Sequence, residues 1–452
     1  MNECRRTLAS TFVLVCVCVL LAVGSCAPRK NSGPVGRPED DPSVPEESSS
    51  PDTVSLFFTG NELGALKPCG CTGGQLGGLS KRAPVLSAVA DESRLIVDTG
   101  ALVEDEDEQA LIKFNIINRA FDVMGYDAVN LTARDLRTAR NLGLLVDPPV
   151  PFASAYQAPE QVVTRVIERR FILDEVPPFI VRVVPFDPQM APVSKLVELL
   201  SSRSDTPAVN VVLLNSRQPQ TLDQIEELAV RVDCVVCPAE GDEPVRLSAN
   251  GERPIVFTIG RRGKYVCRVD IVEPPQSGTI PPEMRYEAIP VTEDIDPDEE
   301  LVRLYTRYQE ILRQSDLLRK HPRVPLENGL KYVGSQSCAP CHEKIFEHWK
   351  TTQHASAWAT LDEVGSEADP ECITCHVIGF DYEEGFITKE KTPELINVGC
   401  ENCHGPGSKH VGSAGVEEPG RPRSVCLDCH TPEHSGPYAG NREKYWEKIK
   451  HW

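Results

Sequence analysis

The sequence predicts an α/β region followed by a mostly α-helical, loop-rich region, and three observations carry this prediction. Short apolar strands alternate with helical patterns between residues 54 and 292. No histidine occurs before His321, although the chain contains 10 histidines. Cysteines and histidines then recur at a fixed spacing between residues 338 and 430. The two regions therefore differ in composition, and we expect them to differ in chemistry.

The amino end is typical of an exported protein. Arg5 and Arg6 precede an apolar run from Leu8 to Val23, and Gly24-Ser25-Cys26 follows. This end is similar to a bacterial lipobox, in which the cysteine is acylated and becomes the mature N-terminus. We expect residues 1–26 to be a lipoprotein-type signal peptide. A single spanning helix or an ordinary signal peptide is the alternative.

The next segments predict a tether and an α/β domain. Residues 27–53 are rich in proline, serine and acidic residues, so we expect them to be disordered. Within the domain at 54–292, apolar residues recur at helical spacing from residue 107 to 124, which predicts an amphipathic helix on the sheet. Strands are expected at residues 54–59, 94–98, 208–214 and 254–259.

A connecting helix is expected within residues 293–325. Leu301, Tyr308 and Leu312 share one helical face, and prolines at 322 and 325 end the pattern. We expect this helix to fix the last region, residues 326–452, against the α/β domain.

The last region contains four copies of the motif C-x-x-C-H. Two cysteines at this spacing can form thioethers to one haem, and the adjacent histidine can ligate its iron. Paired zinc sites do not need a histidine after every second cysteine. We therefore predict four covalent c-type haems. The copies are Cys338-Ala-Pro-Cys341-His342, Cys372-Ile-Thr-Cys375-His376, Cys400-Glu-Asn-Cys403-His404 and Cys426-Leu-Asp-Cys429-His430.

Six further histidines are candidates for the second axial position. A second histidine gives a six-coordinate iron suited to electron transfer, whereas its absence leaves an open site. His354 lies 12 residues after His342, roughly 18 Å along a helix, so it is expected to serve another haem. The Gly-Pro-Gly-Ser turn between His404 and His410 favours a different haem for His410 too. The six are His321, His348, His354, His410, His434 and His451.

Residues 331–434 resemble the cytochrome c554 family of tetrahaem proteins. The resemblance rests on residues 332–342, Trp349, His354-Ala-Ser-Ala357 and residues 400–410. It implies closely stacked haem pairs with mostly bis-histidine irons. It further implies that His410 caps the haem of His342, and that His354 caps the haem of His430. The haem of His404 then takes His434 or His451, while the haem of His376 is open or takes His348.

The front domain resembles the 5′-nucleotidase branch of the metallophosphoesterases, in landmarks at residues 57–64, 97–100, 124–130, 232–237 and 259–265. This implies an α/β/β/α sandwich. Those enzymes hold two metals largely through histidines at strand ends. Because no histidine is present, we expect a domain without metal ligands that is not an active phosphoesterase. The matching positions hold Asn61-Glu62-Leu63, Gly100-Ala101, Thr132-Ala-Arg-Asp135, Asn215 and Cys237-Pro-Ala-Glu240.

Cysteines occur near the same predicted strand ends, at Cys69, Cys71, Cys234 and Cys237. Four sulfurs that converge there would bind a soft metal or shuttle between dithiol and disulfide. Structural disulfides are the alternative in an exported protein. Cys267 is expected to be a small buried hydrophobe.

Taken together, these features predict a periplasmic electron carrier anchored to the membrane through lipidated Cys26. Its partners would be redox proteins, as an electron carrier requires. The net charge of −20 argues against nucleic acid as a partner. The alternative is an oxidoreductase of a small nitrogen or sulfur compound, which would act at a five-coordinate haem or at the front cysteines. The sequence leaves the choice between carrier and enzyme, and the oligomeric state, open.

Overall fold

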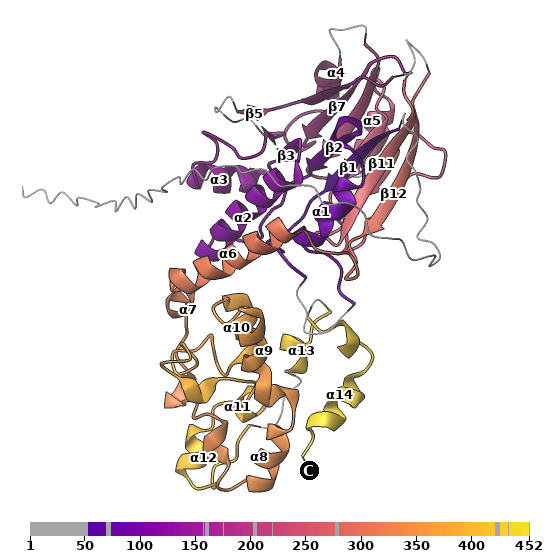
Figure 1. Ribbon diagram of the computed structural model, residues 1–452. Coiled ribbons are helices and arrows are strands. Elements are labelled where there is room, and N and C mark those ends of the chain that lie inside the picture. Colours follow the sequence, from indigo (N-terminus) through magenta and orange to yellow (C-terminus); the bar gives the residue numbers. More distant parts are fainter. Residues whose placement is uncertain are drawn as a thin grey trace, which may run out of the picture. The chain divides into compact units, whose positions relative to one another are not determined.

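The computed structural model describes residues 53–68, 74–156, 158, 162–174, 176–201, 206–218, 220–275, 280–420, 425–432 and 434–451 (Figure 1). The predicted signal peptide, the lipidation site Cys26 and nearly all of the tether lie outside these described residues, as do Cys69 and Cys71. Within the described ranges, no helix combines the length and the apolar character that a membrane crossing requires.

In the described part of the chain, the first sheet has seven strands in the order β12-β11-β1-β2-β3-β4-β5. Strands β1 to β5 are parallel, whereas β11 runs antiparallel to both β1 and β12. The strands are β1 (Val54–Thr59), β2 (Arg94–Asp98), β3 (Ala128–Asn130), β4 (Phe152–Ala153), β5 (Val163–Thr164), β11 (Tyr265–Glu273) and β12 (Glu283–Pro290).

The second sheet, counted over the same described residues, has five strands in the order β10-β9-β8-β7-β6. Strands β7 to β10 are parallel, and β6 pairs antiparallel with β7. The strands are β6 (Ile167–Phe171), β7 (Phe179–Phe186), β8 (Ala208–Leu214), β9 (Cys234–Cys237) and β10 (Ile255–Thr258).

The predicted α/β/β/α sandwich is confirmed by the way these sheets are packed. Apolar side chains from both sheets, such as Leu56, Val97, Val211 and Phe257, form one buried cluster between them. A second cluster joins the outer face of the first sheet to α1 (Leu79–Ser87), α2 (Glu108–Met124), α3 (Ala133–Asn141) and α6 (Glu299–Ser315). A third joins the second sheet to α4 (Lys195–Leu200) and α5 (Thr221–Glu226).

Helix α2 shows why the local sequence folds as predicted. The Asp107 side chain caps its first turn by accepting a hydrogen bond from the Ala110 N–H at 2.7 Å. Gly125 ends it with a left-handed backbone at φ 72°, which glycine adopts without steric cost. Between these caps, Phe114 and Phe121 are fully buried against the first sheet.

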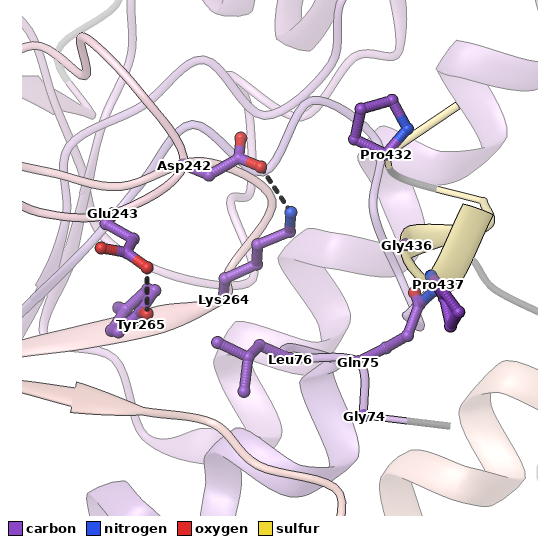
Figure 2. Close-up of a pocket in the computed structure, with 10 residues that line it drawn as sticks. All are labelled: Gly74, Gln75, Leu76, Asp242, Glu243, Lys264, Tyr265, Pro432, Gly436 and Pro437. Atoms are coloured by element: carbon purple, nitrogen blue, oxygen red, sulfur yellow. Dashed lines mark hydrogen bonds and ion pairs between the residues drawn. The ribbon is translucent and has the colours of Figure 1, made fainter. Parts of the chain in front are cut away.

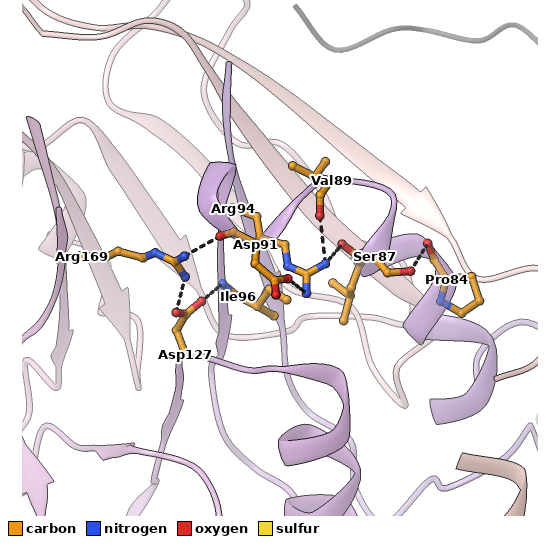
Figure 3. Close-up of polar contacts among 9 residues, drawn as sticks. Pro84, Ser87, Val89, Asp91, Arg94, Ile96, Asp127 and Arg169 are labelled. Carbon is orange, nitrogen blue, oxygen red and sulfur yellow. Dashed lines mark hydrogen bonds and ion pairs between the residues drawn. The ribbon is translucent and has the colours of Figure 1, made fainter. Parts of the chain in front are cut away.

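Polar contacts join the two sheets near the amino end of β2 (Figure 3). Arg94, at the start of β2, donates a hydrogen bond to the Leu86 carbonyl at 2.7 Å. Arg169 of β6 pairs with Asp127, whose carboxylate also accepts a hydrogen bond from the Ile96 N–H at 2.8 Å. Arg169 therefore connects the second sheet to the first.

After α6 the chain forms short helices separated by loops. One small apolar cluster, which includes Trp358, Ile373 and Phe386, lies at the centre of this region. Over the described residues, the α-helices of this region are α7 (Leu317–Lys320), α8 (Glu343–Lys350), α9 (Ala357–Val364), α10 (Pro370–His376), α11 (Cys400–His404), α12 (Ser408–Gly412), α13 (Cys426–Cys429) and α14 (Arg442–Ile449).

Candidate haem sites

Each C-x-x-C-H motif is wound as a helical turn. The second motif lies within α10 and the third within α11. In the first, the His342 N–H donates to the Cys338 carbonyl at 3.0 Å, and in the fourth the His430 N–H donates to that of Cys426 at 2.8 Å. A helical turn places residues three apart on the same side. All eight motif cysteines are free thiols that retain some solvent exposure.

Histidine rings face one another in three pairs among the described residues. The ring centres are 6.0 Å apart for His342 and His410, 6.2 Å for His354 and His430, and 6.1 Å for His404 and His451. A metal–imidazole bond of roughly 2 Å on each side places two ring centres about 6 Å apart. Each separation of ring centres therefore matches that of two imidazoles bound to one metal ion.

The other ring nitrogen of several of these histidines has a fixed partner. Backbone carbonyls contact Nδ1 of His376 at 2.6 Å, of His404 at 2.9 Å, of His410 at 2.6 Å and of His451 at 3.1 Å. A carbonyl only accepts hydrogen bonds, so Nδ1 carries the proton and Nε2 keeps its lone pair for a metal. The Nδ1 atom of His430 contacts Ser435 Oγ at 2.9 Å.

Burial supports the neutral form of three of these rings. It lowers the pKa of His354, His376 and His430 below the ordinary value for histidine, and for His354 the neighbouring His430 lowers it further. A neutral imidazole is the form that ligates a metal. The residues present therefore fit the haem that the motifs predict.

The remaining histidines lie in other surroundings. His321 contacts the Asp381 carboxylate at 2.8 Å and stacks on Phe380 with ring centres 4.1 Å apart. His348 is exposed on α8, and His434 is exposed with its Nδ1 atom 2.8 Å from Thr431 Oγ1. The ring that faces His404 is therefore that of His451, rather than the alternative His434.

Contacts between cysteines of different motifs give the motifs a spatial order. The thiols of Cys338 and Cys400 lie close enough to shift each other's pKa, which places the first motif beside the third. The thiols of Cys375 and Cys429 join the second motif to the fourth in the same way. Cys403 is electrostatically coupled to a cysteine of the fourth motif, Cys426. The order in space is therefore first, third, fourth, second.

Glu401, inside the third motif, is a positioning residue that the sequence analysis missed. Its buried carboxylate accepts hydrogen bonds from the N–H groups of Val333 at 3.0 Å, Gly334 at 2.7 Å and Gly407 at 2.7 Å. It thus fixes the segment before the first motif against the third. Burial raises the pKa of Glu401, against the effect of these backbone donors. No local pattern distinguishes it from an exposed glutamate.

In the front domain, the loops that the phosphoesterase resemblance singles out meet at the carboxyl ends of the parallel strands. The Asn61 N–H donates to the Gly100 carbonyl at 2.8 Å, and Asn130 Nδ2 donates to Asn215 Oδ1 at 2.8 Å. The Asp135 carboxylate accepts from the Ala101 N–H at 2.8 Å. Over the described residues, no group of three or more histidine, cysteine or acidic side chains is placed to hold a metal ion.

A buried polar network lies beside these loops. The Arg82 guanidinium pairs with Glu62 at 2.6 Å, and Thr59 Oγ1 donates to Asp98 at 2.7 Å. Tyr126 Oη links the two halves through contacts with Thr59 at 3.0 Å and Arg82 at 3.2 Å. Burial, with Glu62 nearby, raises the pKa of Asp98 to about 7.

The expectation that the front cysteines converge is wrong for Cys234 and Cys237. Both are free, buried thiols on β9, three residues apart. Residues at this spacing in a strand point to opposite faces. Accordingly, Cys234 lies in the cluster between the sheets and Cys237 in the cluster beyond the second sheet. Cys267 is buried as predicted.

A cavity of about 410 Å³ lies between the front domain and the loop after the fourth motif (Figure 2). Lys264 Nζ pairs with Asp242 at 2.6 Å in its wall, and Tyr265 Oη donates to Glu243 at 3.2 Å. Its lining residues are Gly74, Gln75, Leu76, Asp242, Glu243, Lys264, Tyr265, Pro432, Gly436 and Pro437.

Comparisons with known proteins agree with the cytochrome resemblance of the last region. Residues 337–405 match the family model "Cytochrome c554 and c-prime". Cytochrome c-554 of Nitrosomonas europaea is 30% identical over an alignment of 149 residues, and the match covers 25% of this chain. The chain spans 63% of that relative's length.

Solved structures to which the chain is similar include a calcineurin-like phosphoesterase and a 5′-nucleotidase precursor. The calcineurin-like phosphoesterase YfkN of Bacillus subtilis matches with 13% identity and a TM-score of 0.45, over 57% of this chain and 97% of its own. The 5′-nucleotidase precursor of Thermus thermophilus matches with 14% identity and a TM-score of 0.44, over 70% of this chain and 68% of its own.

Proposed function

We propose that this chain is a multihaem c-type cytochrome, exported and anchored through Cys26, that transfers electrons through four covalently bound haems. The observation that carries the proposal is the set of three facing histidine pairs, each with one member that belongs to a C-x-x-C-H motif. The match to the cytochrome c554 model over residues 337–405 supports the same function. Its partners are redox proteins.

The ligands are assigned from the ring pairs. His342 and His410 hold the first haem, His404 and His451 the third, and His430 and His354 the fourth. His376 is the proximal ligand of the second haem, oriented by its Nδ1 contact with the Ala357 carbonyl at 2.6 Å. The motif cysteines, Cys338, Cys341, Cys372, Cys375, Cys400, Cys403, Cys426 and Cys429, form the thioethers.

When bound, haem supplies an iron that changes oxidation state by one electron. The chain's own residues hold each ring at a fixed position, because the motif turns and the Nδ1 contacts fix the ligands. The contacts between Cys338 and Cys400 and between Cys375 and Cys429 support close approach of the first and third haems and of the second and fourth. Short separations of this kind suit electron transfer along the order first, third, fourth, second.

Spectra of the purified oxidised and reduced protein test this proposal against the alternative oxidoreductase. Three bis-histidine irons predict a mostly low-spin spectrum, with at most one haem that binds carbon monoxide after reduction. Carbon monoxide binding to two or more haems would contradict the ligand assignment. Turnover of a small nitrogen or sulfur compound by such a haem would favour the oxidoreductase.

A further inference from the structure

The helix that carries the second motif begins against two helices from outside residues 326–452. Helix α10 contains Cys372, Cys375 and His376, and the side chain of Asp369 caps its first turn. Asp369 is only 7% exposed. The neighbouring helices are α2, which belongs to the front domain, and α6, which packs beside α2 (Figure 1).

Asp369 is held by three donors. Its Oδ1 atom accepts hydrogen bonds from Gln109 Nε2 of α2 at 2.8 Å and from the Glu371 N–H at 3.0 Å. Its Oδ2 atom accepts from Tyr308 Oη of α6 at 3.1 Å. Gln109 Nε2 also donates to Tyr308 Oη at 2.9 Å. Because the three side chains are buried, the loss of one partner leaves a polar group without water or protein to replace it.

Further contacts hold the turn between α9 and α10 to the same helices. Gln309 Nε2 donates to the Val364 carbonyl at 2.7 Å, and Arg313 pairs with Glu367 at 2.8 Å. Lys113 of α2 pairs with Glu371 at 2.5 Å. The start of α10 is thus attached to α2 and α6 at several points, which limits its movement.

Helices α9 and α10, which flank this turn, also orient the proximal histidine of the second haem. His376 Nδ1 contacts the carbonyl of Ala357, the first residue of α9, at 2.6 Å. The turn held by α2 and α6 connects the end of α9 to the start of α10. A displacement of that turn would therefore shift both the His376 ring and the carbonyl that orients it.

We propose that Asp369 is a positioning residue for the second haem, through which Gln109 and Tyr308 make that haem depend on the front domain. The proposal rests on the function proposed above, because it takes Cys372, Cys375 and His376 as haem attachments. It gives the front domain a role without phosphoesterase chemistry: it fixes the geometry of one of the four haems.

The test is a double variant, Gln109→Leu with Tyr308→Phe, which removes both outside donors and keeps the cap bond to the Glu371 N–H. We expect the second haem alone to change its electron paramagnetic resonance signal. Its oxidised-to-reduced ratio at a fixed potential should change about tenfold, equivalent to about 59 mV for one electron. A His376→Met variant identifies which signal belongs to this haem.

Asp298→Ala is the matched control for a general loss of stability. Asp298 caps the other end of α6 by accepting from the Leu301 N–H at 3.0 Å. Loss of this cap should lower the melting temperature of the protein, as the double variant does. The second haem should keep its electron paramagnetic resonance signal. If the double variant lowers the melting temperature as this control does and the second haem is unchanged, the positioning role is refuted.

The Asp369→Asn variant distinguishes a positioning role of Asp369 from an effect of its negative charge on the second haem. Asparagine keeps an acceptor for Gln109 and for the helix cap, and its amide can donate to Tyr308 Oη. Positioning predicts a second haem close to wild type, whereas an equal shift in this variant and the double variant would contradict it. A haem count below four in the wild-type protein would instead refute the proposed function.

Discussion

The front domain and the C-terminal region fill their interiors in different ways. The front domain buries apolar side chains in three clusters, between its sheets and on both outer faces. The C-terminal region has one small cluster, and beyond residue 396 Tyr438 is the one buried apolar residue in the part that the structure describes. Because its apolar core is so small, we expect this region to depend on bound haem for its stability. The front domain is thus expected to fold on its apolar core, whereas the C-terminal region is expected to need its cofactors.

The largest expected effect comes from removing one haem attachment. Cys400→Ser with Cys403→Ser should lower the haem content and unfold much of the C-terminal region, because this motif lies between the first and fourth in space. The front domain should keep its own melting transition. Limited proteolysis with fragment identification checks both statements. Unfolding of the front domain in the same variant would contradict its independent stability.

A substitution in the apolar core of the front domain should destabilise that domain and leave the haems of the C-terminal region unchanged. Phe257 is fully buried between the sheets against Phe58 and Tyr286. Phe257→Ala should destabilise the front domain by about 3–5 kcal/mol, the usual cost for a buried phenylalanine. Urea denaturation followed by far-ultraviolet circular dichroism measures this, and the spectra of the first and third haems should not change.

A pH effect of a few kcal/mol on the stability of the front domain is expected from one buried carboxylic acid. Burial raises the pKa of Asp98 to about 7, above its value in the unfolded chain. The protonated acid is thus favoured on folding, so its contribution is fully present below about pH 4 and is lost as the pH rises toward 7. Asp98→Asn should reduce this slope in urea midpoints measured from pH 4 to 8. An unchanged slope would contradict the assignment.

The smallest expected change in stability accompanies a local test of the third haem. His451→Ala removes the ring that faces His404, so one haem should become high-spin and bind carbon monoxide. His434→Ala is the matched control, because His434 is exposed and contacts Thr431. Both variants should keep four haems. High-spin character in the His434 variant and not in the other would reverse the assignment.

Features fixed by neighbouring residues were predictable from the sequence. Helix α2 begins after Asp107 and ends at Met124 as its apolar spacing indicates, and the strands at 54–59, 94–98 and 208–214 match as well. The motif turns are local too. The opposite orientation of Cys234 and Cys237 was missed, although it follows from strand geometry once both residues are placed on one strand.

Features fixed by distant residues were not predictable. Gln109 and Asp369 are 260 positions apart, and no pattern in either segment indicates their contact. The choice between His434 and His451 depends on where α14 places the end of the described chain. The thiol contacts that order the motifs likewise join segments far apart in sequence, such as those of Cys338 and Cys400.

The mass of the intact purified protein under denaturing conditions counts the covalent haems, because thioether-bound haem remains attached when the chain unfolds. We predict the mass of the processed chain plus four haems. A mass with fewer than four haems, or with none and bound zinc in the native protein, would contradict it.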